Sequence, residues 1–247
     1  MLNYILLGII QGLTEFFPVS SSGHLVIAQH LLGLTQNGLA LSVVLHLGTV
    51  FALLVFFFRD LLELLSNLRL LLLLLVVTVI TAIIGLSGKS FFESLFSSTT
   101  AVAVALVVTG ITLIFTKRFM QGKRDSLGLT DAFILGLTQS IAIIPGISRS
   151  GITISTLLFR GIEREKSMRI SFLAGIPVIF AAALLESRKI DFALKTEWRG
   201  MLLGFLASFV FGIIALKILK LILQKARLYY FGYYCIFIAV VVLLFIR

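Results

Sequence analysis

The sequence predicts an all-α protein that crosses a membrane several times and consists of two copies of one helical unit in inverted topology. Three observations support this fold class: the composition, the charges of the loops and an internal repeat. The 247 residues are 59% hydrophobic and only 13% charged, which is more apolar surface than a soluble domain of this length needs. Because the apolar residues form long runs instead of alternating with polar ones, the pattern favours helices over a membrane β-barrel.

The apolar runs are long enough to span a bilayer, since about 20 apolar helical residues cross its hydrocarbon core. Runs without Asp, Glu, Lys or Arg occupy residues 16–58, 70–88, 94–116, 132–148, 170–185, 200–216 and 228–246. We predict full spans near 40–58, 69–88, 97–116, 168–186, 199–217 and 228–246. The first residues lack the basic stretch and cleavage pattern of a secretory signal peptide, so we expect them to belong to the membrane domain.

The loops between these spans fall into a basic set and a less basic set. The basic set is 59–69, 117–128, 160–169 and 217–227, with 2, 4, 4 and 4 Lys or Arg residues. The other set is 33–39, 87–97, 187–198 and residue 247, with 0, 1, 3 and 1. The positive-inside rule places the basic set in the cytoplasm. The net charge of +10 is thereby explained by membrane anchoring, and we expect no nucleic-acid partner.

Two segments remain that enter and leave the membrane on the same side. Residues 129–160 connect two basic loops, so we expect a re-entrant helical hairpin that is broken near Pro145 and Gly146. Residues 2–33 form the matching hairpin from the other face, broken near Pro18. Irregular backbone at this depth persists only where it is buried or lines a wet cavity.

A polar pattern recurs within these hairpins, 128 positions apart. The first copy is Leu7, Gly8, Gln11, Ser20, Ser22 and Gly23, and the second is Leu135, Gly136, Gln139, Ser148, Ser150 and Gly151. We therefore expect two repeats, 1–120 and 121–247, which form a single membrane domain and each contain one hairpin and three full spans. Because three is odd, the second repeat is inverted, and such folds place their site near the midplane, where the two breaks meet.

The two copies differ at positions that carry reactive or charged groups. Glu15 aligns with Ile143, Ser21 with Arg149, and His24 with Ile152. Ionisable groups at membrane depth are costly, so a functional site is the default interpretation. One half would then supply acid–base groups and the other half the cation.

The first hairpin contains candidates for both acid–base chemistry and anion binding. Gln11 and Glu15 lie one turn apart on the same helix face, and Glu15 is either a general base or a structural carboxylate. Three serines and a glycine precede a new helix, which is an arrangement that binds anions or merely caps the helix. His24 follows directly and titrates near physiological pH, so we favour function over a structural role for it.

The second hairpin supplies a cation. Arg149 is the only Lys or Arg within residues 125–159, and its fork matches phosphate or carboxylate oxygens. The alternative, an arginine that reaches up to the membrane surface, conflicts with its predicted depth. Ser148, Ser150 and Thr153 would donate further hydrogen bonds to the same anion.

The remaining polar or unusual residues in the apolar runs receive no catalytic assignment. We expect His30 and His46 to be structural, and Pro177 to kink its span. Cys235 is the only cysteine and forms no internal disulfide or metal cluster. A purely structural membrane protein would leave Arg149 unexplained.

The segment from Gln11 to His24, which reads QGLTEFFPVSSSGH, and the segment from Pro145 to Thr153, which reads PGISRSGIT, together resemble the two signatures of the undecaprenyl-diphosphatase family. These are bacterial membrane phosphatases of bacitracin resistance, and the similarity extends over the whole chain. Gln11 stands where many members have Glu, and it cannot act as a base or as a charged metal ligand.

The resemblance implies hydrolysis of undecaprenyl diphosphate to undecaprenyl phosphate and phosphate, which recycles the lipid carrier for peptidoglycan synthesis. It also implies a location in the bacterial cytoplasmic (inner) membrane, with the site open to the periplasmic side. Mg²⁺ or Ca²⁺ would bind mainly through the substrate, and Glu15, the only carboxylate at depth, is the candidate ligand from the protein. We expect no organic cofactor. The partners are the polyprenyl diphosphate and the bilayer, and the choice between monomer and homodimer stays open.

We expect the catalytic residues to be Glu15, His24, Ser21 and Arg149. The substrate-binding residues would be Gln11, Ser20, Ser22, Ser148, Ser150 and Thr153. The nucleophile is His24, Ser21 or a water held by Glu15, and the sequence does not separate them. A transporter or flippase for an anionic or lipid-phosphate substrate is the alternative function, because inverted repeats with broken helices also occur in transporters.

Overall fold

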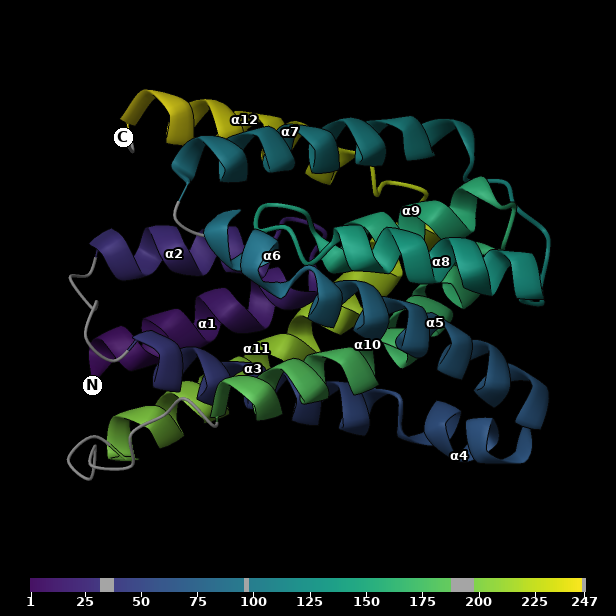
Figure 1. Ribbon diagram of the computed structural model, residues 1–247, viewed down its shortest axis with the longest axis horizontal. Coiled ribbons are helices and arrows are strands. Elements are labelled where there is room, and N and C mark those ends of the chain that lie inside the picture. Colours follow the sequence, from purple (N-terminus) through teal and green to yellow (C-terminus); the bar gives the residue numbers. More distant parts are fainter. Residues whose placement is uncertain (32–37, 96–97, 188–197, 246–247) are drawn as a thin grey trace.

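The computed structural model describes residues 1–31, 38–95, 98–187 and 198–245, and helices make up most of this part of the chain (Figure 1). Within these residues the only β-type pairing is an isolated bridge between Arg124 and Ile162. The long helices run roughly alongside one another across the molecule. The predicted all-α membrane architecture is therefore confirmed.

The long apolar helices coincide with the predicted spans. Among the described residues, four are long and apolar enough to cross a membrane: α5 (Leu68–Ser87), α7 (Thr99–Phe115, extended by a short 3-10 turn to Arg118), α10 (Arg164–Ser187, with Pro177 inside) and α11 (Trp198–Gln224). A fifth span is reached if α3 (Gly38–Phe56) and α4 (Phe58–Ser66), which are bent by 67° relative to each other, are counted as one broken span. The last predicted span is α12 (Tyr230–Phe245), which at 16 residues is shorter than a full crossing.

Two predicted loops contain helices, so the loop assignment was wrong there. Residues 59–69 include α4, and residues 87–97 include α6 (Lys89–Leu95). In α4, Asp60 and Glu63 share a polar face that pairs with Arg169, while Leu64 is buried. The loop prediction rested on the charged residues alone. It did not use the leucines between them, whose spacing is typical of a helix.

Other helix boundaries also differ from the predicted ones. The helix α11 continues to Gln224, beyond the predicted end at 217, and α10 begins at Arg164, before the predicted start at 168. In both cases charged residues extend an apolar helix by one or two turns. The reason is that lysine and arginine are good helix formers, so a charged stretch marks the membrane boundary without ending the helix.

The two predicted hairpins are present as pairs of short helices. The first pair is α1 (Leu2–Phe16) and α2 (Ser21–Leu31), and the second is α8 (Leu129–Ile141) and α9 (Arg149–Phe159). In Figure 1 the two pairs lie toward opposite ends of the molecule, with their connecting turns near the middle. The second turn contains Gly146 at φ 96°, and its missing side chain lets the turn approach the backbone of Val102.

Each hairpin packs against a long helix of the other half. The helix α1 lies along α11, α8 lies along α5, and α7 lies along α12. Small residues allow these close approaches: a Cβ atom on Gly12 would lie 2.6 Å from the Ser208 carbonyl oxygen, and one on Gly110 would lie 2.8 Å from that of Gly232. In the two repeats α1 is equivalent to α8, and α5 is equivalent to α11. The α1–α11 contact and the α8–α5 contact are therefore equivalent. This pairing is expected of two interlocked repeats, whose inverted orientation stays a prediction.

The four basic loops meet at one end of the molecule. The contacts that join them are Lys166–Asp125 (3.5 Å), Arg169–Asp60 (2.7 Å), Lys220–Glu165 (3.4 Å), and the hydrogen bonds from Arg124 to the Arg160 carbonyl (2.9 Å) and from Arg164 to the Gln224 carbonyl (2.8 Å). Loop charge alone had grouped these four segments on one face. The structure brings them together.

A buried carboxylate joins the two arms of the second hairpin at this end. Asp131, 2% exposed, accepts hydrogen bonds from Arg124 Nη2 (2.6 Å), Arg160 Nε (2.7 Å) and the Gly128 amide (2.9 Å). Burial by itself would raise the pKa of Asp131, but these three donors outweigh it and lower the pKa to about 2. The start of α8 is thereby tied to the end of α9.

Candidate active site

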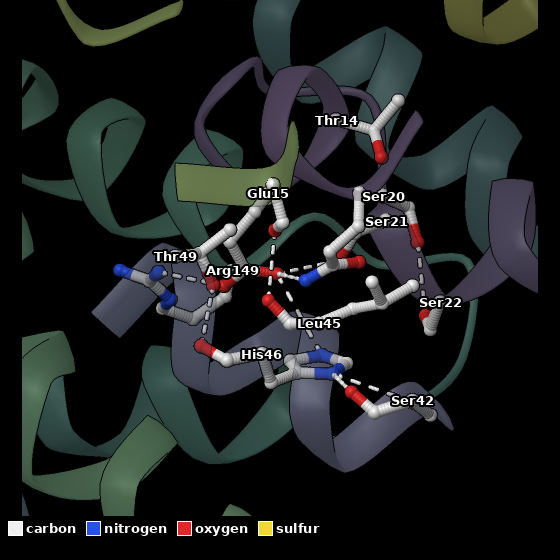
Figure 2. Close-up of polar contacts among 12 residues, drawn as sticks. Thr14, Glu15, Ser20, Ser21, Ser22, Ser42, Leu45, His46, Thr49 and Arg149 are labelled. Carbon is white, nitrogen blue, oxygen red and sulfur yellow. Dashed lines mark hydrogen bonds and ion pairs between the residues drawn. The ribbon is translucent and has the colours of Figure 1, made fainter. Parts of the chain in front are cut away.

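Glu15 is buried at the end of α1 and is the point on which both hairpins converge (Figure 2). Its Oε2 atom accepts hydrogen bonds from Gln11 Nε2 at 3.2 Å and from Ser21 Oγ at 2.7 Å. Its Oε1 atom accepts one from Arg149 Nη2 at 3.1 Å, which is also an ion pair. The predicted helix-face pairing of Gln11 with Glu15 is confirmed.

The turn between α1 and α2 directs Ser21 back toward Glu15. Ser20 has a φ of 68°, a left-handed conformation that is costly for a residue other than glycine. This conformation reverses the chain directly before α2, so that the first residue of that helix reaches the last turn of α1. Strained backbone of this kind persists only where the surroundings impose it, and it is common in active sites.

Arg149 is the first residue of α9, and its guanidinium is only partly satisfied. Ser148 caps the helix by accepting the Gly151 amide at 3.1 Å. The Nη1 atom is buried and has no hydrogen-bond partner among the described residues. It lies against Gly175, where an added Cβ atom would collide with it, and the guanidinium stands 5.4 Å from the Phe172 ring. A buried donor without a partner is costly, so Nη1 is suited to an anionic oxygen.

Equivalent positions of the two repeats thus meet at one carboxylate. Ser21 and Arg149 are separated by 128 positions, and they bond to the two different oxygens of Glu15. Two equivalent residues can touch the same group only if that group lies close to the axis relating the repeats. The predicted convergence of the hairpin breaks is therefore seen directly at Glu15, whereas its depth in the bilayer stays a prediction.

His24 faces away from this cluster. Its Nδ1 atom lies 2.8 Å from the Ser20 carbonyl oxygen and its Nε2 atom 2.8 Å from the Tyr234 hydroxyl, with the two rings stacked. In the described part of the chain, no hydrogen bond or ion pair joins His24 to Glu15 or Arg149. The sequence placed His24 with Glu15 opposite Arg149, and the structure instead shows it bound to α12.

His46 takes the place beside Glu15 that the sequence had suggested for His24. The Nε2 atom of His46 lies 3.8 Å from Glu15 Oε2 (Figure 2). The sequence predicted a structural role for His46, and only its position in an apolar run argued against that role. Neither Phe172 nor Gly175 carried any sequence signal, because both residue types are ordinary in membrane helices. The side chain of His30 lies outside those described.

The predicted anion-binding hydroxyls bond mainly within the hairpins. Ser20 Oγ lies 3.2 Å from Ser22 Oγ, and Ser148 Oγ lies 3.2 Å from Ser150 Oγ. Ser150 Oγ also donates to the Phe17 carbonyl at 3.4 Å, which joins the two breaks.

Thr153 Oγ1 donates to the Arg149 carbonyl at 2.7 Å and lies 2.6 Å from Ser171 Oγ on α10. The structure brings this hydroxyl to the same turn as Arg149. Its bonds hold the start of α9 against α10, so they support the position of the guanidinium.

The donor set around Glu15 does not form a protein-held metal site. In the residues that the structure describes, no three His, Cys, Asp or Glu side chains are grouped closely enough to hold an ion. Both oxygens of Glu15 are already bonded to protein donors, and hard cations take six or more oxygen ligands. Any cation at this site would need most of its ligands from the substrate.

Comparison with known proteins identifies the family. A family model described as bacitracin resistance protein BacA matches residues 4–241. The undecaprenyl-diphosphatase of Syntrophotalea carbinolica is 44% identical over 248 residues, 95% of this chain and 94% of the relative. Those of Halothermothrix orenii and Korarchaeum cryptofilum are 41% and 40% identical, over 97% of this chain and 96% and 97% of the relatives. The chain therefore belongs to the bacitracin resistance protein BacA family.

Proposed function

We propose that this chain is an undecaprenyl-diphosphatase, a membrane enzyme that hydrolyses undecaprenyl diphosphate to undecaprenyl phosphate and inorganic phosphate. The observation that carries the proposal is the buried Glu15 carboxylate, held between the Ser21 hydroxyl and the Arg149 guanidinium. A base that contacts both a hydroxyl and a cation brings together groups that phosphoryl transfer requires. The relatives that carry the same name agree with this assignment.

Arg149 is proposed to bind the diphosphate. Its Nη1 atom offers an unused donor, while Nη2 stays on Glu15. A guanidinium in a site with little water stabilises the charge that develops on the transferred phosphoryl oxygens. Ser20, Ser22, Ser148 and Ser150 lie at the two breaks and would supply further donors, while Gln11 and Thr153 keep Glu15 and the start of α9 in position.

Ser21 is proposed as the nucleophile. Its hydroxyl already donates to Glu15 Oε2 at 2.7 Å, so the carboxylate is placed to take the proton as Oγ attacks the terminal phosphorus. The bond from phosphorus to the bridging oxygen breaks, and undecaprenyl phosphate leaves with the electron pair. Water then hydrolyses the phosphoserine. His24 bonds to Tyr234 rather than to Glu15, which leaves it as the weaker candidate, and direct attack by water is the third.

The cellular setting is proposed from the charge asymmetry. The joined basic loops would face the cytoplasm of a bacterial inner membrane, and the site would open toward the periplasmic side. In a chain whose Cys235 is replaced by alanine, a single cysteine introduced as Ser66→Cys or Ser126→Cys should then react with a membrane-impermeant thiol reagent in inside-out vesicles and not in right-side-out ones. The reverse labelling would contradict the orientation, and opposite labelling of the two positions would contradict the topology.

The enzyme would recycle the carrier lipid for peptidoglycan synthesis and confer resistance to bacitracin. We propose that Mg²⁺ or Ca²⁺ reaches the site on the diphosphate oxygens. Phosphate release measured with and without a chelator tests this, because a substrate-borne ion should appear as a dependence of KM on metal concentration.

A transporter of anionic lipids is the alternative, because hairpins from opposite ends of a membrane domain also serve transport. The Ser21–Glu15 contact favours hydrolysis, since an anion carrier has no need of a hydroxyl held on a base. Hydrolysis proceeds in detergent, whereas transport requires sealed vesicles. Phosphate release in detergent therefore separates the two.

The test of the proposed function is phosphate release from undecaprenyl diphosphate by the purified protein and by two variants. We expect Glu15→Gln to lower kcat by about 100-fold or more, because removal of a general base typically costs that much. Glu63→Gln, on the exposed face of α4, is the matched control and should retain activity. A phosphorylated Ser21 should be trappable after rapid acid quench. An active Glu15→Gln enzyme would contradict the assignment of Glu15, and phosphate recovered on His24 would contradict that of Ser21.

A further inference from the structure

His46 touches the proposed base and has no part in the reaction described so far. It belongs to α3, and its Nε2 atom lies 3.8 Å from Glu15 Oε2. The His46 side chain is 25% exposed, whereas that of Glu15 is 8% exposed. The imidazole therefore lies between the buried carboxylate and the surface of the described chain.

The hydrogen bonds of His46 define which ring nitrogen carries a proton. Nδ1 lies 2.8 Å from the Ser42 carbonyl oxygen, while the Ser42 hydroxyl is farther, at 3.4 Å. Because a carbonyl oxygen only accepts, Nδ1 must carry the hydrogen. In the neutral ring, Nε2 then has a bare lone pair, and Figure 2 shows this edge of the ring directed toward Glu15.

Neutral His46 therefore presents a free acceptor to the Glu15 carboxylate, and this contact can receive one proton. Glu15 already accepts hydrogen bonds from Gln11, Ser21 and Arg149. Neutral His46 adds no further donor, because its Nε2 atom carries no hydrogen. A proton on Nε2 converts that contact into an ion pair. Arg149, on the other carboxylate oxygen, is the remaining charged group in contact with the pair.

We infer that His46 holds the proton that Glu15 removes from the nucleophile. The inference rests on the proposed phosphatase function. As the Ser21 O–H bond breaks, Glu15 Oε2 gains the proton and passes it to His46 Nε2, which restores the carboxylate and forms an imidazolium. The imidazolium then releases the proton from the more exposed side of the site. His46 is thus a positioning residue that acts through Glu15 and does not touch the substrate.

The experiment measures kcat and KM for His46→Gln and His46→Ala in the full chain in detergent. We expect kcat to fall about tenfold or more in both variants while KM changes less than about twofold, the pattern for a group needed only in the chemical step. Added imidazole should restore His46→Ala. Pyrazole has the same ring size but is a much weaker base, and it should not restore activity.

Several outcomes would overturn the inference. Wild-type kcat in His46→Gln would do so, and so would equal restoration of His46→Ala by pyrazole and imidazole, because the ring would then only fill space. If His46→Ala does not fold, His46→Gln, which preserves side-chain length, carries the test through kcat. Ser42→Ala retains the carbonyl partner of Nδ1 and is the matched control with unchanged kcat. Failure of the proposed function is distinguishable, because the wild type itself would then release no phosphate.

Discussion

The two re-entrant hairpins share a sequence pattern but differ in what their polar groups contact. In the first hairpin, Gln11 bonds to Glu15 within its own helix. In the second, the equivalent Gln139 bonds to Thr81 on α5 at 3.2 Å, and the position equivalent to Glu15 is Ile143. The first hairpin therefore presents its glutamine to the site, whereas the second uses its equivalent glutamine to attach to the surrounding bundle.

The difference shows how a duplicated scaffold makes an asymmetric site. Symmetry places the residues at positions 21 and 149 at the same carboxylate, and divergence makes one a hydroxyl and the other a guanidinium. A symmetric site would have carried two serines or two arginines there. Two serines would provide no cation for the diphosphate, and two arginines would remove the proposed nucleophile.

The largest effect is expected from Arg149, the charged group that only the second hairpin supplies. Arg149→Lys keeps the charge but loses the planar fork that reaches Glu15 and leaves Nη1 free. We expect phosphate release to fall about 100-fold or more, as for the loss of a donor to a developing anionic charge. Arg118→Lys, at the end of α7, is the control. Near-normal kcat/KM in Arg149→Lys would show that only charge matters at this position.

A smaller effect is expected from the glycine that makes room for this side chain. In Gly175→Ala the added Cβ atom would collide with Arg149 Nη1, so the guanidinium must shift. A misplaced cationic group should lower kcat/KM about tenfold, with the thermal midpoint changed little. Gly85→Ala on α5 controls for an added methyl group, because its Cβ atom would meet only the terminal methyl group of the flexible Ile143 side chain. Unchanged kcat/KM in Gly175→Ala would argue that Arg149 is mobile.

The equivalent glutamines provide the most direct test of the comparison. Gln11→Leu removes a hydrogen bond to the Glu15 carboxylate and should lower kcat several-fold, because Ser21 and Arg149 still hold that carboxylate in place. Gln139→Leu should leave kcat unchanged. It should alter the free energy of unfolding by about 1 kcal/mol or less, because Thr81 still donates a hydrogen bond to the Val77 carbonyl. Equal effects of the two substitutions on kcat would contradict the proposed division between the hairpins.

The smallest effect on activity is expected from Asp131, which lies at the basic end of the second hairpin. Its pKa of about 2 is below the ordinary 3.8, so the folded chain binds fewer protons there than the unfolded chain. The resulting stabilisation, about 2 kcal/mol, is fully present above pH 4 and is lost as the pH falls through 2. Unfolding in detergent should show this loss in the wild type and not in Asp131→Asn. Parallel pH curves for both proteins would contradict it.

The sequence predicted much of the fold because membrane helices depend on local properties. Apolar length placed α5, α7 and α10 within a few residues, and loop charge correctly grouped the four basic segments. The helices α4 and α6 were missed because charge was interpreted as a membrane boundary without regard to helical spacing. The repeat located both hairpin breaks, since turns with Pro, Gly and Ser interrupt helices through local backbone preferences.

The sequence by itself determined that this is a polytopic helical membrane protein with a duplicated polar pattern. It also singled out Glu15, Ser21 and Arg149, which the structure brings together. These properties follow from the composition, from the length of the apolar runs and from the positions at which the two repeats differ. Only the tertiary structure decided that His46 rather than His24 lies beside Glu15, and that Phe172 and Gly175 surround Arg149. The physical reason is that helix rotation and the crossing of α1, α3 and α10 set these contacts through packing, which leaves no local mark in the chain.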